Sequence, residues 1–176
     1  LKNGEIPIYE PGLDALVAQN SEAGRLKFST DVASAVADAE VVFIAVGTPS
    51  RRGDGHADLA YVASAAEMIG RAMKGFTVVV TKSTVPVGTG DEVERIIRKV
   101  NPAADFAVVS NPEFLREGAA IEDFKRPDRI IVGIEDERAR QVMESVYRPL
   151  YLNQGPVMFT GRRTAELIKY AANAFL

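Results

Sequence analysis

The sequence has no cysteine, a single histidine and no long apolar or basic run, and each absence excludes a class of function. Without cysteine, these 176 residues can form no disulfide, no thiolate metal site and no cysteine nucleophile. His56 alone cannot build a multi-histidine metal site, and it excludes most histidine-centred catalytic triads. We therefore expect no metal site in these residues.

Membranes and nucleic acids are also unexpected as partners. No apolar stretch approaches the roughly 20 residues that cross a bilayer, and the first residues lack a signal-peptide pattern. Lysine and arginine number 21 against 24 acidic residues, a net charge of -3 with no extended basic run. We therefore expect no membrane, no nucleic acid, and a cytoplasmic protein. The composition, 47% hydrophobic and 26% charged, is ordinary for one soluble domain.

The glycine fingerprint G-x-G-x-x-G of dinucleotide-binding domains is missing as well. The glycine pair at 53–55 is followed by Asp58 where the third glycine belongs, and the pair at 88–90 is followed by Val93. If the chain belongs to a dinucleotide-binding domain, we therefore expect the pyrophosphate site upstream of Leu1.

Apolar runs typical of strands alternate with amphipathic runs typical of helices along the whole chain. The predicted strands are 27–29, 41–46, 76–81, 106–109, 129–132 and 156–159. The predicted helices are 13–19, segments capped by Asp31, Asp58 and Asp136, 89–99, 119–123, and 163 to the end. The run 41–46 should be buried on both faces. This alternation predicts an α/β fold with a mostly parallel sheet and helices on both faces.

Unusual polar turns follow three of the predicted strands, at 47–49, 82–86 and 111–113. Because ligands bind beyond the carboxyl ends of parallel strands, all three turns should lie along one edge. Small hydroxyl residues there can hold a phosphate or a ribose. The alternative is that threonine and serine serve the turns locally.

The third turn, 110–118, carries two glutamates and an arginine. If the chain after Pro112 is helical, Glu113 and Glu117 share a face and repel each other unless Arg116 or a ligand cation intervenes. That arrangement suits a general acid or base. The alternative is a pair of solvated residues at a helix start.

The last predicted helix carries Lys169 and Asn173 on one face, because they are four residues apart. The alternative for Lys169 is the solvated side of an amphipathic helix. The small residues Ala171 and Ala172 would let a ligand or another backbone approach.

Six motifs resemble, in order and spacing, the UDP-glucose 6-dehydrogenase family. They are I-P-I-Y-E-P-G-L (6–13), V-G-T-P-S (46–50), K-S-T-V-P-V-G (82–88), S-N-P-E-F-L-R-E-G (110–118), R-P-D-R-I-I-V-G (126–133) and A-E-L-I-K-Y-A-A-N-A-F-L (165–176). The resemblance implies a Rossmann-like, incomplete dinucleotide-binding domain over 1–160, followed at 161–176 by the start of a long central connecting and dimerisation helix. It implies a homodimer or higher homo-oligomer through that helix.

The resemblance also implies a reaction. In the family, NAD-dependent enzymes oxidise UDP-glucose in two steps to UDP-glucuronate, which feeds polysaccharide biosynthesis. A downstream cysteine attacks the aldehyde, hydride leaves a thiohemiacetal, and water hydrolyses the thioester. This sequence has no such cysteine, so we expect the chain alone to be inactive. The alternatives are a GDP-mannose or UDP-N-acetyl-mannosamine dehydrogenase, or a non-catalytic nucleotide-sugar-binding module.

Residue roles carried over from the family fall into three groups. The catalytic group would be Thr84 and Glu113, which position water, Glu117 near the nicotinamide, Lys169 at the developing oxyanion, and Asn173 beside it. The NAD contacts would be Val46, Gly47, Thr48, Pro49, Ser50, Ser83, Thr84, Val85 and Glu117. The substrate contacts would be Glu113, Phe114, Leu115, Arg116, Glu117, Lys169, Tyr170, Ala171, Ala172 and Asn173.

Overall fold

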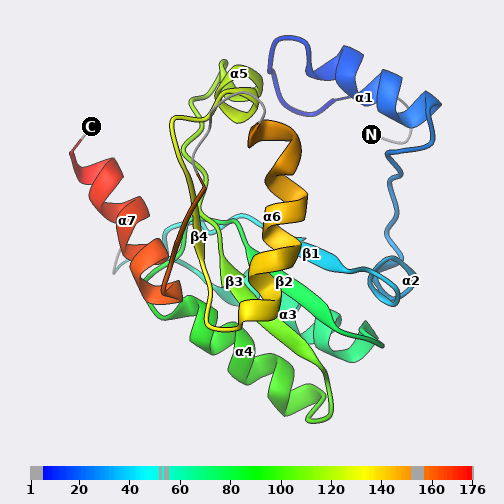
Figure 1. The fold of residues 1–176 in the computed structure, drawn as a ribbon, viewed down its shortest axis with the longest axis vertical. Helices are drawn as coiled ribbons and strands as arrows, with labels where there is room; N and C mark the ends of the chain where they lie inside the picture. The colour runs from blue at the N-terminus through cyan, green and yellow to red at the C-terminus, as the bar shows by residue number, and fades with distance from the viewer. Residues whose placement is uncertain (1–5, 52, 54–55, 152–156, 176) are drawn as a thin grey trace.

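A five-stranded sheet forms the centre of the molecule (Figure 1). The computed structural model describes residues 6–51, 53, 56–151 and 157–175. The strands stand side by side in chain order, as β1 (Val41–Ile44), β2 (Thr77–Thr81), β3 (Phe106–Ser110), β4 (Ile130–Gly133) and β5 (Val157–Thr160). The predicted start of the last strand at Pro156 lies outside the described residues.

Strand direction changes once within the sheet. Strands β1, β2 and β3 are parallel to one another, and β5 is parallel to β4. Strand β4 is antiparallel to β3, which it meets through the pair Ser110 and Gly133. The predicted mostly parallel sheet is therefore confirmed, with one reversal that the sequence did not indicate.

Helices cover both faces of the sheet, as predicted. On one face, Val79 and Val108 pack with α3 (Ala60–Ala72) and α4 (Thr89–Val100). On the other face, Val78 and Val109 pack with α6 (Glu137–Tyr151). The alternation follows from the two-residue period of a strand, since every residue of β2 and β3 is buried.

The remaining helices lie at the margins of this sandwich (Figure 1). They are α1 (Leu13–Glu22), α2 (Val32–Val36), α5 (Ala120–Lys125) and α7 (Arg162–Ala174). None of the ten residues of α1 is buried, whereas α7 packs against β3 and β4. None of the helices in the described part of the chain is both long and apolar enough to span a membrane.

One strand prediction was wrong, and another was wrong in part. Residues 27–29 form no strand, because no described strand pairs with them. Strand β1 ends at Ile44, and it is not buried on both faces, since the Phe43 side chain is 38% exposed. Within the described sheet β1 is an edge strand that pairs only with β2, so less of the core surrounds it.

Three aspartates were predicted to cap helices, and each accepts a hydrogen bond from a backbone amide at or near the start of its helix. Asp31 is the N-cap of α2, where its carboxylate accepts a hydrogen bond from the Ser34 amide at 3.1 Å. Asp58 stands one residue before the cap position of α3 and accepts from the Ala60 amide at 2.9 Å. Asp136 accepts from the Arg138 amide at 2.9 Å, at the start of α6.

Candidate active site

The carboxyl ends of the three parallel strands meet at one edge of the sheet, as predicted. Ile44 pairs with Thr81, and Thr81 pairs with Ser110, so the three following turns begin at the same level. Hydrogen bonds tie two of these turns together. The Thr48 hydroxyl donates to the Thr84 carbonyl at 2.9 Å, and the Ser83 hydroxyl donates to the Val46 carbonyl at 2.6 Å. The turns 46–50 and 83–85 therefore form one continuous surface.

The third turn has a different conformation from the one predicted. Residues 111–116 are not helical, so Glu113 and Glu117 do not share a helix face. Glu113 is partly buried, whereas Glu117 is exposed. Arg116 does not lie between them, because its guanidinium pairs with Asp123 at 2.7 Å. The expected carboxylate pair is therefore absent, because Glu113 pairs with Lys169 and Arg116 pairs with Asp123 instead.

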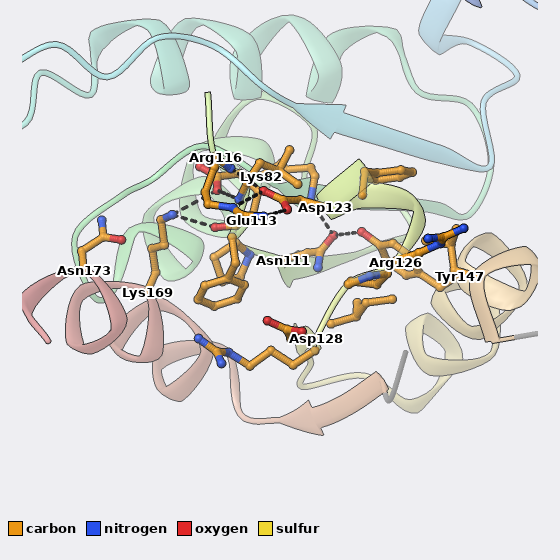
Figure 2. A pocket seen from close by; sticks show the side chains of 18 residues that line it. Lys82, Asn111, Glu113, Arg116, Asp123, Arg126, Asp128, Tyr147, Lys169 and Asn173 are labelled. Carbon is orange, nitrogen blue, oxygen red and sulfur yellow. Dashed lines mark hydrogen bonds and ion pairs between the residues drawn. The ribbon is translucent and has the colours of Figure 1, made fainter. Parts of the chain in front are cut away.

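Glu113 instead faces Lys169 from helix α7 (Figure 2). The Lys169 ammonium donates to the Glu113 carbonyl at 2.7 Å and to its carboxylate at 3.0 Å. The Lys169 residue is only 8% exposed, so the alternative of a solvated lysine is wrong. The ammonium also lies 5.4 Å from the centre of the Phe114 ring, which favours a cation there. Asn173 lies one helical turn further along α7, beside Lys169.

A cavity of about 500 Å³ opens between this turn, helix α7 and the segment before β4. The residues that line it are Lys82, Asn111, Pro112, Glu113, Phe114, Leu115, Arg116, Asp123, Phe124, Arg126, Pro127, Asp128, Arg129, Ile130, Tyr147, Leu150, Lys169 and Asn173. Six of the predicted substrate contacts are among them. Glu117, Tyr170, Ala171 and Ala172 do not line the cavity.

The segment 126–129 was quoted in a motif but not predicted as part of the site. It reaches the cavity because β4 is antiparallel to β3 and meets it at the last residues of both strands. The start of β4 therefore extends beyond the end of β3, next to the turn 110–118. The Arg129 guanidinium lies over the Phe114 ring, 4.7 Å from its centre. The sequence did not indicate this reversal, so this wall of the site was not predicted.

The cavity carries more positive than negative charge. Five basic side chains line it against three acidic ones, an excess of two positive charges. Such an excess attracts an anionic ligand, and arginine suits the paired oxygens of phosphates.

Three further residues at the base of the cavity were not predicted as site residues: Lys82, Asn111 and Tyr147. The Asn111 side chain is buried, donates to the Ile131 carbonyl at 2.8 Å, and accepts from the Tyr147 hydroxyl. It also accepts from the Lys82 ammonium at 3.5 Å. Burial lowers the pKa of Lys82 to about 8, Glu113 opposes that change, and Lys169 adds to it. Burial raises the pKa of Tyr147 to about 12.

A second cavity, of only about 10 Å³, lies between the turns and helix α7. It is lined by Thr84 from the predicted NAD side and by Lys169 from the predicted sugar side. Ser110, Pro112 and Glu166 complete much of its wall. The structure thus brings Thr84 and Lys169 together, although 85 positions separate them in the sequence. No group of three or more histidine or acidic residues in the described part of the chain could hold a metal ion.

Known proteins are similar to this chain in sequence and in fold. A 74% identical relative is UDP-glucose 6-dehydrogenase from Rhizobium meliloti, matched over all of this chain and 41% of its own length. UDP-glucose 6-dehydrogenase from Pseudomonas aeruginosa is 49% identical over the whole chain and 40% of its own length. The chain therefore spans about two fifths of these relatives.

Solved structures of nucleotide-sugar dehydrogenases have the same fold as this chain. A UDP-glucose dehydrogenase from Pyrobaculum islandicum superposes with a TM-score of 0.93 at 45% identity, over 99% of this chain and 40% of its own. A GDP-mannose dehydrogenase from Pseudomonas aeruginosa gives a TM-score of 0.91 at 38% identity, over 98% of this chain and 40% of its own. Residues 1–151 match the NAD-binding domain model of the UDP-glucose/GDP-mannose dehydrogenase family, so the chain belongs to that family.

Proposed function

We propose that the protein containing this chain oxidises the C6 alcohol of UDP-glucose to the carboxylate of UDP-glucuronate, with NAD as oxidant. The observation that carries the proposal is the ion pair of buried Lys169 and partly buried Glu113 at the wall of a cavity with excess positive charge. The Rhizobium meliloti relative, named UDP-glucose 6-dehydrogenase, supports the choice of substrate.

Lys169 is proposed to stabilise negative charge that develops on the substrate oxygen. Its ammonium is held by two acceptors of Glu113 and is largely shielded from water, so it is oriented before the reaction begins. A fixed cation in a site of low dielectric constant stabilises a developing oxyanion far better than a solvated one does. Asn173, on the same helix face, is proposed to add a hydrogen-bond donor.

Glu113 and Thr84 are proposed to position the water that hydrolyses the acyl intermediate. Glu113 lines the large cavity, and Thr84 lines the small one. Lys169 lines both cavities. The excess of basic side chains, including Arg126 and Arg129, is proposed to attract the diphosphate of the nucleotide sugar. Glu117 is retained as a proposed nicotinamide contact.

The turns 46–50 and 83–85 fit the part of NAD that lies over the strand ends. A Cβ atom placed on Gly47 would meet no atom within 4 Å, so the turn is open on that side. Around it, Thr48, Ser50 and Ser83 offer hydroxyls close to exposed backbone. We propose that these turns, with Val46, Pro49, Thr84 and Val85, contact the cofactor. NAD, when bound, supplies the acceptor for the hydride that the alcohol carbon loses.

Two related proposals concern the organisation of the whole protein. Residues 1–160 are proposed to belong to the NAD-binding domain, and 161–176 to begin a central connecting helix. The exposed apolar residues of α7, among them Leu167 at 57% exposure, are proposed to form the seam of a homodimer or higher homo-oligomer. We place the protein in the cytoplasm, where its product would enter polysaccharide biosynthesis.

Two other substrates should be compared directly with UDP-glucose, and the GDP-mannose dehydrogenase noted above has nearly the same fold. The test is to purify the complete protein and to follow NADH formation with UDP-glucose, GDP-mannose and UDP-N-acetyl-mannosamine. We expect NADH with UDP-glucose alone, two molecules for each sugar oxidised. Preference for another sugar would overturn the substrate, and inertness with all three would favour a non-catalytic binding module. The isolated chain 1–176, which has no cysteine, should give no turnover.

A further inference from the structure

Glu166 is the most buried acidic residue in the described part of the chain, with 3% of its surface exposed. Its carboxylate accepts three hydrogen bonds. They come from the Gly88 amide at 2.6 Å, the Gly90 amide at 2.8 Å and the Ser110 hydroxyl at 3.0 Å. None of the donors belongs to its own helix, so Glu166 connects α7 to two other parts of the fold.

The first part is the amino terminus of α4. Its N-cap residue is Gly88, which has no side chain to accept the free amides of the first turn, and its φ of 94° suits glycine. Glu166 supplies the missing acceptor from 78 positions away, and its negative charge is favourable at a helix amino terminus. Gly90 permits this approach, because a Cβ atom there would lie 2.9 Å from Arg162 Cδ and 3.1 Å from Glu166 Oε1.

Each partner of Glu166 adjoins a residue of the proposed active site. Gly88 ends the turn that contains Thr84, Ser110 lies three residues before Glu113, and Glu166 itself precedes Lys169 by about one helical turn. Thr84, Ser110, Glu166 and Lys169 also line the same small cavity. One carboxylate thus lies where the NAD turn, the catalytic turn and the lysine-bearing helix converge.

We propose that Glu166 is a positioning residue, which fixes Thr84, Glu113 and Lys169 relative to one another without touching the substrate. Its role in catalysis rests on the proposed function. A cap that served stability alone would need only one acceptor at the start of α4. An acceptor from α7 differs in that it orients the two turns and the helix together, and catalytic geometry is sensitive to displacements of about 1 Å.

The test is Glu166→Gln in the complete protein. The amide has the same shape, but it has one acceptor oxygen, so at least one glycine amide loses its partner. We expect kcat with UDP-glucose to fall by about tenfold to a hundredfold. The KM for UDP-glucose should stay within about twofold, because the residues that line the large cavity do not include Glu166.

The matched control is Glu94→Gln, which weakens another contact between the same two helices. Glu94 pairs with Arg162 at 2.8 Å but touches neither turn. Both variants should lower the melting temperature by a few degrees, and only Glu166→Gln should lower kcat. Equal losses of kcat in the two variants would overturn the positioning role.

Hydrogen exchange on the same proteins needs no turnover, so it separates this inference from the proposed reaction. If Glu166 holds the turns, Glu166→Gln should speed amide exchange at 83–90 and 111–115 by about tenfold, while Glu94→Gln should not. Exchange that stays at the wild-type rate would overturn the inference, even if UDP-glucose proves to be the substrate. Should Glu166→Gln fail to fold, Ser110→Ala removes a single hydrogen bond and should show the same effects more weakly.

Discussion

Lys169 combines burial, charge and two acceptors in one position. The ammonium reaches both the carbonyl and the carboxylate of Glu113, and the Phe114 ring lies close to it. Removing the lysine would leave the Glu113 carboxylate, 30% exposed at its side chain, without its cation. The residue therefore affects both the charge of the cavity and the conformation of the turn.

We predict that Lys169→Ala in the complete protein lowers kcat by about a hundredfold or more, because a preorganised cation at the developing charge is lost. The measurement is steady-state NADH formation with UDP-glucose. The control is Lys99→Ala, which removes an exposed lysine of α4 and should leave kcat unchanged. A Lys169→Ala enzyme with kcat within twofold of wild type would contradict the proposed role.

Lys82 makes the stability of the protein depend on pH. Burial lowers its pKa from 10.5 to about 8 in the folded state. Below about pH 8 both states hold the proton, and the full cost of burying the charge is present. Between about pH 8 and 10.5 the unfolded chain holds the proton that the folded chain has lost, so the stability contributed by this group rises with pH.

We therefore predict that wild type gains stability relative to Lys82→Met as the pH is raised. Between about pH 7 and pH 9.5, the difference in free energy of unfolding should move by roughly 2 kcal/mol in favour of wild type. Urea unfolding of both proteins at the two pH values measures it, and other titrating groups cancel in the difference. A difference that does not change with pH would show that Lys82 keeps its ordinary pKa.

At the scale of elements, the hydrophobic pattern predicted strands β2 and β3 well, but it does not reveal the orientation of α7. Strands β2 and β3 contain runs of three and four consecutive apolar residues, as expected for strands buried on both faces. The inner face of α7 instead carries Arg162, Glu166 and Lys169, and Leu167 faces outward. Polar residues can point inward there because each finds partners on α4 or on the turn 110–118, and periodicity alone cannot reveal such partners.

In the site, too, features that follow from the local sequence could be predicted, whereas contacts between distant residues could not. Strand-end turns could be predicted, because parallel strands end at one edge. The wall formed by 126–129 could not, since the reversal at β4 depends on a single pair, Ser110 and Gly133. Nor could the ties of Asn111 to Tyr147 and to Ile131, which join residues 36 and 20 positions apart.

Gly133 shows how closely α7 approaches the sheet. A Cβ atom at this position would lie 2.7 Å from Ala165 Cβ and 2.8 Å from the Arg162 Cα atom. Since the second neighbour is backbone, the helix would have to move. We predict that Gly133→Ala destabilises the protein by about 2 kcal/mol and also lowers kcat, because α7 carries Lys169. Gly75→Ala is the control, since nothing lies within 4 Å of its added Cβ; equal stability of the two variants would contradict this packing.

At the scale of the whole molecule, the outward side of α7 presents exposed apolar residues. Leu167 is 57% exposed, Tyr170 40%, and Ala171 and Ala174 also face outward on the same side. Their spacing of three and four residues makes a continuous apolar stripe along the helix. Such a stripe is typical of a helix that packs against another, which supports the proposed oligomer seam.

We predict that Leu167→Asp in the complete protein weakens self-association by at least about a hundredfold, since a buried unpaired charge costs several kcal/mol at an interface. Sedimentation velocity over a range of protein concentrations measures the change. Met68→Asp is the matched control, because Met68 is 46% exposed on α3, away from this stripe, and its replacement should leave the oligomer intact. If Leu167→Asp sediments as wild type does, the seam lies elsewhere; if wild type is itself a monomer, the stripe must pack within its own chain.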